Sequence, residues 1–384
     1  PGFNYPQWLG TQLAASPINV DVVSGNYQSS FRNYLNLLPY WTAINPHTGN
    51  KWIDDYDHET LVGTPSGKQI IVSSYQVHCM WFYNKELFDK ANVQPPKTWP
   101  EWLEVCRKLK NAGITPIAAN YSYMIPQWDA EVYYDQFMRI ERYEFGRAQE
   151  GDWSWDPEKD GKLKFDPKEK FFDKAYTFST QRWLNNLKSG TSSYARVELA
   201  LHGQRRSEIC KTTYCTEDMF VMTDVYLPFL QRQVAIMNNG TWSIPTLSRD
   251  ATELTDARRE ALKIGKDVKI EPFEWGTFDN PSMIDDLVDG PARAVESSTG
   301  PYGSVVQKDQ AQTELSLDLL MYFFSPAGFQ VFIDGLVKEN AFSPSGPSFV
   351  KNVKFPADIA EMFKDLQMIG NAEIGWNQCA QIGA

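Results

Sequence analysis

The chain has few residues of the kinds that bind metals, nucleic acids or membranes. It contains 5 Cys and 4 His among 384 residues, and the histidines lack the spacing of a metal site. No apolar run approaches the roughly 20 residues that a membrane-spanning helix needs. Its net charge of −11 argues against nucleic acid and anionic membranes, because phosphate binding needs clustered cations. We therefore expect no metal, no cofactor and no nucleic-acid partner.

Signatures of common catalytic sites are also missing. The sequence has no Gly-x-Ser-x-Gly elbow and no dinucleotide fingerprint. Residues 63–69 miss a phosphate-binding loop by one residue and carry Gln69 where magnesium needs Ser or Thr. Residues 156–167 begin like a calcium loop but end in Pro167 instead of a bidentate Glu. We predict no catalytic residue.

Glycoside hydrolysis stays open as an alternative, because it needs only two suitably placed carboxylates. The candidates are Asp54, Asp55, Asp57, Glu131, Asp285 and Asp286. Nothing in the sequence pairs any two of them, and surface carboxylates are the ordinary case.

The cysteines bear on the compartment. Cys210 and Cys215 flank a polar Lys-Thr-Thr-Tyr segment and could close a small disulfide, which would fit an oxidising environment. Cys79 and Cys106 lie in apolar surroundings that are typical of buried thiols.

Aromatic residues are abundant, with 13 Trp, 18 Tyr and 22 Phe. Most of them are expected to fill cores. An excess of Trp also suits sugar recognition, because the apolar face of a pyranose stacks on an indole. Composition alone leaves these two interpretations even.

Residues 71–120 predict a complete β-α-α-β unit. Met80–Tyr83 is a continuous apolar run, typical of a strand that is buried on both faces. Asn84 suits the cap of a short helix over Lys85–Lys90, and Pro116 begins another extended run. This order indicates an α/β layer fold with parallel strands.

The second helix of this unit has a clear start. Thr98 and Glu101 form a capping box. The apolar residues that follow share one helical face: Trp99, Trp102, Leu103, Cys106 and Leu109.

The segment from Tyr83 to Ala118 (YNKELFDKANVQPPKTWPEWLEVCRKLKNAGITPIA) resembles the extracellular solute-binding proteins of ABC importers, in the sugar-binding branch that includes maltose-binding protein. The agreement is long and without gaps. The resemblance implies a binding protein without catalytic activity. It also implies an α/β, two-lobed, periplasmic-binding-protein-like fold of type II, with a hinge and a ligand cleft between the lobes.

Two further segments resemble the same family. Gln231–Pro245 (QRQVAIMNNGTWSIP) matches the pattern of an apolar run followed by Asn-Gly-x-Trp, in which the Trp stacks on the sugar. The resemblance assigns that role to Trp242. The alternative role for Trp242 is to pack beneath the end of the strand. Leu320–Gln330 and Gly335–Pro344 are similar to segments of the family that re-enter the second lobe and lie near the cleft.

The resemblance also implies a domain division. Lobe one would comprise residues 1–75 and 276–330, and lobe two residues 76–275 and 331–384, with crossings near Tyr75, Trp275 and Gln330. The family normally begins with a strand, a helix and a second strand. Only about one helix, near Trp8–Ala15, precedes the first motif, so we expect that this amino-terminal part is missing from the chain.

Seven candidate ligand residues accompany Trp242. Asn26, Tyr27 and Gln28 follow a strand expected at Asn19–Val23, at the sheet edge where ligands bind in open α/β sheets. Gln76 and Trp128 are predicted from their places beside the crossover strand and a later strand end. Trp275 and Tyr302 are predicted from the second hinge and its following loop. These candidates are Asn26, Tyr27, Gln28, Gln76, Trp128, Trp275 and Tyr302.

The expected function is binding of a carbohydrate, in particular an oligosaccharide, by hinge closure, and its delivery to the membrane permease of an ABC importer. We expect a monomer outside the cytoplasm, either periplasmic or lipid-anchored as a lipoprotein on the outer face of the cell membrane. A glycoside-cleaving enzyme and a carbohydrate-binding adhesion protein are the alternatives.

Overall fold

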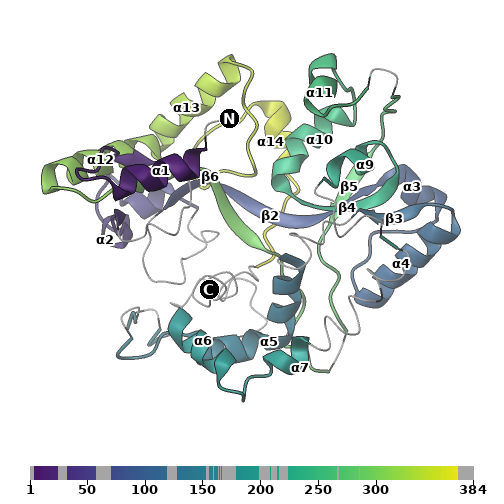
Figure 1. The fold of residues 1–384 in the computed structure, drawn as a ribbon, viewed down its shortest axis with the longest axis horizontal. Coiled ribbons are helices and arrows are strands. Elements are labelled where there is room, and N and C mark those ends of the chain that lie inside the picture. Colours follow the sequence, from purple (N-terminus) through teal and green to yellow (C-terminus); the bar gives the residue numbers. More distant parts are fainter. Residues whose placement is uncertain are drawn as a thin grey trace. The chain divides into compact units, whose positions relative to one another are not determined.

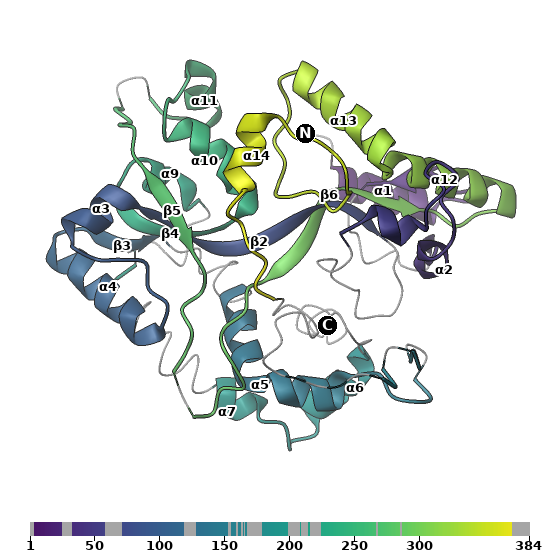
Figure 2. The same ribbon diagram turned by 180° about the vertical axis from the view of Figure 1, so that it is seen from behind.

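The computed structural model (Figures 1 and 2) describes residues 4–24, 33–57, 71–118, 128–152, 155–158, 160–162, 164, 166, 179–198, 208, 214–215, 224–265, 268–284 and 286–370. The chain forms two compact units. Unit 1 is Pro1–Gln76 with Ser298–Lys364, and unit 2 is Val77–Ser297 with Asp365–Ala384. The chain therefore passes between units after Gln76, Ser297 and Lys364. The lobe division implied by the family resemblance, with crossings near Tyr75, Trp275 and Gln330, stays a prediction.

Unit 1 combines helices with a small sheet. Its elements are α1 (Tyr5–Ala14), β1 (Val22–Val23), α2 (Leu38–Trp41), the 3₁₀ helix η2 (Trp52–Asp55), the first residues of β2 (Val72–Asn84), the end of β6 (Glu296–Val305), α12 (Gln310–Phe323), α13 (Pro326–Lys338) and α14 (Ala357–Phe363). Strand β1 pairs antiparallel with β6, Val22 opposite Val305. One buried cluster of this unit contains Leu9, Leu13, Val23, Tyr34 and Val306.

Unit 2 contains the larger number of described elements. They are α3 (Lys85–Lys90), α4 (Trp99–Asn111), β3 (Thr115–Ala118), α5 (Ala130–Gly146), α6 (Thr180–Lys188), α7 (Tyr194–Glu198), α9 (Tyr226–Leu230), β4 (Val234–Gly240), the 3₁₀ helix η6 (Thr241–Ser243), α10 (Ile244–Asp250), α11 (Asp256–Ala261) and β5 (Trp275–Phe278). Helix α4 packs against β3, and α9 packs against β4.

The sheet of unit 2 corrects the expected strand directions. Strand β4 pairs antiparallel with β2, from Cys79 opposite Gly240 to Tyr83 opposite Ile236. Strand β5 also pairs antiparallel with β2, and β3 runs parallel to β4. The β2-α3-α4-β3 unit was therefore wrongly predicted to give parallel strands. Strand β4, which comes from far along the chain, lies between β2 and β3 in the strand order.

The local signals around α3 and α4 are confirmed. Asn84 Oδ1 accepts the N–H of Leu87 at 3.0 Å, as expected of a helix cap. The Glu101 carboxylate accepts the N–H of Thr98 at 3.3 Å and completes the capping box. The buried face of α4 was predicted with one error. Val105 is buried in place of Leu103.

Strand β2 runs unbroken over Val72–Asn84, so the passage after Gln76 lies within a strand. Strand β5 occupies Trp275–Phe278. Helix α5 begins at Ala130 and has a kink at Met138.

Helix α5 is held by a buried ion cluster. The carboxylate of Asp135 accepts hydrogen bonds from Arg139 Nη2 at 2.7 Å, Arg142 Nη2 at 2.7 Å and Arg293 Nε at 2.9 Å. All four side chains are at most 2 % exposed. Burial raises the pKa of Asp135, but the guanidinium charges outweigh burial and hold this pKa well below its usual range. The cluster joins α5 to the segment before β6.

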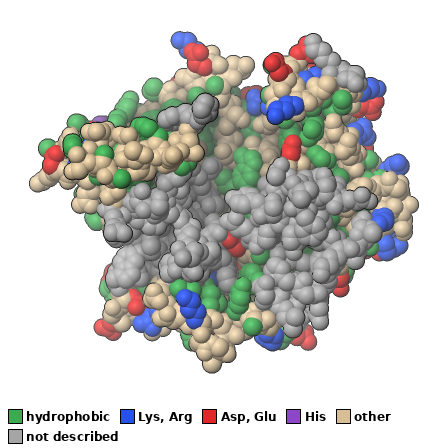
Figure 3. Space-filling view, viewed as in Figure 1, with side chains coloured by type: hydrophobic (Ala, Val, Ile, Leu, Met, Phe, Trp, Pro, Cys, Tyr) green, Lys and Arg blue, Asp and Glu red, His purple; other side chains and the backbone are tan. Residues whose placement is uncertain are grey.

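The surface of unit 2 carries charges of both signs. Figure 3 shows Lys and Arg side chains interspersed with Asp and Glu along α3, α4 and α11. On α4, for example, Glu104 contacts both Arg107 and Lys108. No single helix in the described part of the chain is long and apolar enough to cross a membrane. Helices α12 and α13 reach that length and composition only together, with a bend of 66° between them.

Cysteines and metal ligands complete the description. Cys79, Cys106 and Cys215 are buried. Cys210 lies outside the described residues, so the disulfide expected between Cys210 and Cys215 stays a prediction. Within the described ranges, no group of three or more His, Cys, Asp or Glu side chains is arranged to hold a metal ion.

Candidate functional site

Unit 2 brings two of the predicted ligand residues together. Trp242 lies in η6, directly after β4, and Trp128 lies two residues before α5. Their rings meet edge to face, with centroids 5.4 Å apart and an interplanar angle of 65°. Both side chains are half-buried. A half-buried aromatic pair of this kind offers ring surface to a ligand while its other side packs on the protein.

A glycine at the end of β4 makes room for Trp242. A Cβ atom at Gly240 would lie 2.1 Å from Cζ3 of the Trp242 indole, far inside van der Waals contact. Only glycine therefore lets the backbone approach the ring so closely. Thr241, between them, accepts the N–H of His78 on its Oγ1 at 3.3 Å. This bond ties the start of η6 to β2.

Polar side chains lie beside the aromatic pair. Asn238 is 1 % exposed, and its Nδ2 donates to Asp129 Oδ1 at 3.3 Å. Asn238 Oδ1 is buried without a hydrogen-bond partner among the described residues. Asn239 Oδ1 accepts the N–H of Gly240 at 2.9 Å. The strand end thus places amide and carboxylate groups, which suit sugar hydroxyls, next to indole rings.

His78 on β2 contacts two carboxylates, those of Asp279 and Glu296. His78 is 1 % exposed, and its Nε2 lies 2.7 Å from Asp279 Oδ1. Its Nδ1 lies 3.7 Å from Glu296 Oε1. Asp279 is 46 % exposed, so this cluster reaches from the interior to solvent.

Two other candidates, Gln76 and Trp275, have partners of their own. Gln76 belongs to unit 1, where its Nε2 donates to Asp57 Oδ2 at 3.2 Å and the side chain is buried. Trp275 pairs with Asn84 on β2, five residues from the pairing of Cys79 with Gly240. That separation is about 17 Å along the strand. The structure therefore does not bring Trp275 to Trp242.

The remaining candidates are not placed. Asn26, Tyr27 and Gln28 lie outside the described residues. Tyr302 belongs to β6, and its side chain is likewise outside the description. These four stay predictions.

Asp129 and Asn238 were missed by sequence reasoning. Asn238 ends an apolar run, and Asp129 follows a candidate Trp, so both positions carried a weak signal. Their contact joins residues 109 positions apart, and no local pattern predicts such a contact.

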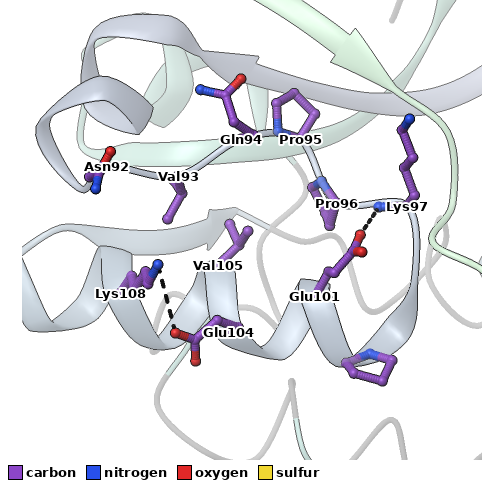
Figure 4. Close-up of a pocket in the computed structure, with 11 residues that line it drawn as sticks. Asn92, Val93, Gln94, Pro95, Pro96, Lys97, Glu101, Glu104, Val105 and Lys108 are labelled. Atoms are coloured by element: carbon purple, nitrogen blue, oxygen red, sulfur yellow. Dashed lines mark hydrogen bonds and ion pairs between the residues drawn. The ribbon is translucent and has the colours of Figure 1, made fainter.

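A surface groove of about 740 Å³ lies elsewhere in unit 2. Figure 4 shows it between residues 92–97 and α4, where Val93 and Val105 face each other and Lys108 contacts Glu104. None of the predicted ligand residues lines this groove, so it is distinct from the aromatic pair.

Comparisons with known proteins identify a related family and related folds. Residues 49–197 match the bacterial extracellular solute-binding protein family. That stretch includes β2, α3, α4 and β3, so the resemblance found in the sequence is confirmed. The matched family is a family of binding proteins.

One curated relative matches a short stretch. The sn-glycerol-3-phosphate-binding periplasmic protein UgpB of Rhizobium meliloti is 39% identical over 46 residues. This match spans 11% of the present chain and 11% of that relative's length.

Solved structures of solute-binding proteins resemble the whole chain. A probable secreted solute-binding lipoprotein from Streptomyces coelicolor gives a TM-score of 0.56 at 12% identity, covering 98% of this chain and 80% of its own. RafE from Streptococcus pneumoniae gives a TM-score of 0.53 at 14% identity, and the match covers 97% of this chain and 78% of RafE. These likenesses confirm the predicted fold class, an α/β two-lobed periplasmic-binding-protein-like fold.

Proposed function

We propose that this protein is the substrate-binding component of an ABC importer and binds an oligosaccharide. The observation that carries the proposal is the edge-to-face pair of Trp242 and Trp128 beside the Asn238–Asp129 contact. Aromatic faces bind the apolar faces of sugar rings, and amides and carboxylates bind hydroxyls. The raffinose complex of RafE resembles this chain with a TM-score of 0.50 at 14% identity, covering 97% of this chain and 81% of its own, which supports a saccharide ligand.

A neutral saccharide fits the described groups better than a phosphorylated solute. Among the described residues of this region, Asp129 contacts Asn238 and Asp279 contacts His78, so the charged groups in these contacts with an acceptor oxygen are carboxylates. A phosphate is normally bound by Arg, Lys or helix N-termini. The name of UgpB refers to glycerol 3-phosphate, but its similarity covers only 46 residues. We therefore place neutral sugars first and glycerol 3-phosphate second.

The proposed mechanism is ligand-induced closure. A sugar that contacts both lobes only in the closed form shifts the population toward that form. The closed monomer then delivers the sugar to the permease subunits in the membrane. This role places the protein outside the cytoplasm, in the periplasm or lipid-anchored at the outer face of the membrane. Asn26, Tyr27, Gln28, Gln76 and Tyr302 stay proposed ligand residues in addition to the Trp pair, whereas Trp275 is paired with Asn84, five residues along β2 from the partner of Gly240.

Two of the six carboxylates nominated for the glycosidase alternative are bound to neighbouring side chains. Asp55 accepts hydrogen bonds from Thr48 Oγ1 at 2.8 Å and from Asn50 Nδ2 at 3.2 Å. Asp57 is bound by Gln76. These contacts give both carboxylates structural partners in unit 1.

The proposal is tested by calorimetric titration and thermal unfolding with a ligand panel. Raffinose, other oligosaccharides, monosaccharides and glycerol 3-phosphate are each added, and the sugars are recovered and analysed by chromatography. We expect one saccharide class to bind and to raise the unfolding temperature, because a ligand at 100 times its Kd stabilises by about 2.7 kcal/mol. Recovery of cleaved sugar would indicate a glycosidase. Binding of glycerol 3-phosphate alone would refute the carbohydrate assignment.

Replacing Gly240 by alanine is expected to weaken saccharide binding. The new Cβ must displace the Trp242 indole, and overpacking of this kind costs about 1–3 kcal/mol. Because the proposed site needs the indole in its original place, the complex bears this cost, which corresponds to roughly five- to 150-fold in Kd. Calorimetry with the saccharide identified above measures the loss. Gly335→Ala is the control, since a Cβ there meets no atom within 4 Å. If Gly240→Ala binds the saccharide with unchanged affinity, the Trp242 indole in this position is not part of the binding site.

A further inference from the structure

The unit 2 ends of all three inter-unit passages are bonded to one another. His78 follows the first passage, Glu296 precedes the second, and Ile369 and Gly370 follow the third. The backbone contributes two of the bonds. Cys79 N–H donates to Val295 O at 3.0 Å, and Ala294 N–H donates to Gly370 O at 3.0 Å.

One buried carboxylate connects the same three segments. Glu296 is fully buried, and its Oε1 accepts the backbone N–H of Ile369 and of Gly370, the latter at 2.8 Å. The same oxygen lies 3.7 Å from Nδ1 of His78. A buried carboxylate is tolerated only when donors such as these compensate for its desolvation. Glu296 on the second segment is therefore stabilised by the backbone N–H donors of the third segment, with His78 of the first segment beside it.

His78 extends this cluster to the aromatic pair. Its backbone N–H donates to Thr241 Oγ1 at 3.3 Å, and Thr241 immediately precedes Trp242. Its Nε2 contacts Asp279 at the end of β5. His78 thus contacts Glu296 through its side chain and Thr241, at the start of η6, through its backbone N–H.

We propose that Glu296 and His78 are positioning residues. They hold the unit 2 ends of the three passages and η6, which contains Trp242, as one rigid body. This inference rests on the proposed function. A hinge works when a few residues absorb the backbone rotation and their neighbours stay fixed. With the unit 2 ends anchored, rotation on ligand binding is confined to the passages after Gln76, Ser297 and Lys364. The Trp242 ring then keeps its position against the ligand.

The first test is hydrogen exchange of Glu296→Ala, Glu296→Gln and the control Glu274→Ala, without ligand. Glu274 is an exposed carboxylate that contacts Lys85. Loss of a buried acceptor is expected to speed exchange at Ile369 and Gly370 about tenfold in Glu296→Ala. Glu296→Gln keeps an acceptor oxygen and is expected to show a smaller change. If Glu296→Ala leaves exchange at the Ile369 and Gly370 amides unchanged, or speeds exchange equally throughout unit 2, Glu296 does not anchor these segments.

The second test is titration of the same variants with the saccharide that binds the wild type. We expect Glu296→Ala to weaken binding about tenfold, Glu296→Gln to weaken it less, and Glu274→Ala to leave it unchanged. Full affinity in Glu296→Ala, despite faster exchange, would overturn the positioning role. If the wild type binds no saccharide, the proposed function and this role fail together. The exchange experiment separates that result from failure of the anchor alone.

Discussion

Replacing Asp135 by asparagine is expected to lower the free energy of unfolding by about 3–5 kcal/mol. Its carboxylate contacts three buried guanidinium groups, those of Arg139, Arg142 and Arg293. An amide of the same size carries no charge, so the guanidinium groups would lose the anion that compensates for their desolvation. The cost is large because removing one partner of a buried ion cluster exposes the full desolvation penalty of the others.

Equilibrium denaturation of wild type, Asp135→Asn and Glu144→Gln measures this effect. Glu144 is an exposed carboxylate on the same helix, and its substitution is expected to change stability by less than about 0.5 kcal/mol. A loss below about 1 kcal/mol in Asp135→Asn would contradict the energetic importance of the cluster.

The same carboxylate predicts a pH dependence with a definite sign. The pKa of folded Asp135 lies well below its usual range, whereas the unfolded chain protonates it near about 3.9. The stabilisation is therefore fully present above about pH 4 and is lost as pH falls, by about 1.4 kcal/mol per pH unit. The unfolding free energies of wild type and Asp135→Asn should converge on acidification. Parallel curves between pH 5 and pH 2.5 would contradict this assignment.

Replacing Trp242 by alanine is expected to weaken saccharide binding by at least about 2 kcal/mol, or roughly thirtyfold in Kd. Trp242 contributes the ring that meets Trp128 at 5.4 Å, and a flat apolar ring has no substitute in alanine. Trp242→Phe keeps part of that surface and is expected to lose less affinity. Calorimetric titration measures all three proteins.

Trp275→Ala is the matched comparison. Trp275 is also half-buried and packs on Phe82 with ring centroids 5.6 Å apart, at the far end of the β2 pairing from Gly240. We expect this variant to bind with nearly unchanged affinity. If Trp275→Ala loses as much affinity as Trp242→Ala, the ligand site is not centred on the Trp128–Trp242 pair.

The elements that the sequence predicted well are those with local signals. Asn84 and the Thr98–Glu101 pair start their helices as expected, because capping bonds join residues three or four positions apart. Errors arose where a choice depends on the neighbouring element. Val105 is buried in place of Leu103, since the packing of α4 on β3 selects which edge of the helical face is covered.

The family resemblance, the helix caps and the position of Trp242 after a buried strand could be predicted from the amino-acid sequence. These properties depend on contiguous residues. Three features required the folded structure: β4 lies between β2 and β3, Asp129 contacts Asn238, and Glu296 contacts Gly370. Such contacts form between distant segments, and their energies come from burial and from hydrogen bonds that exist only after folding.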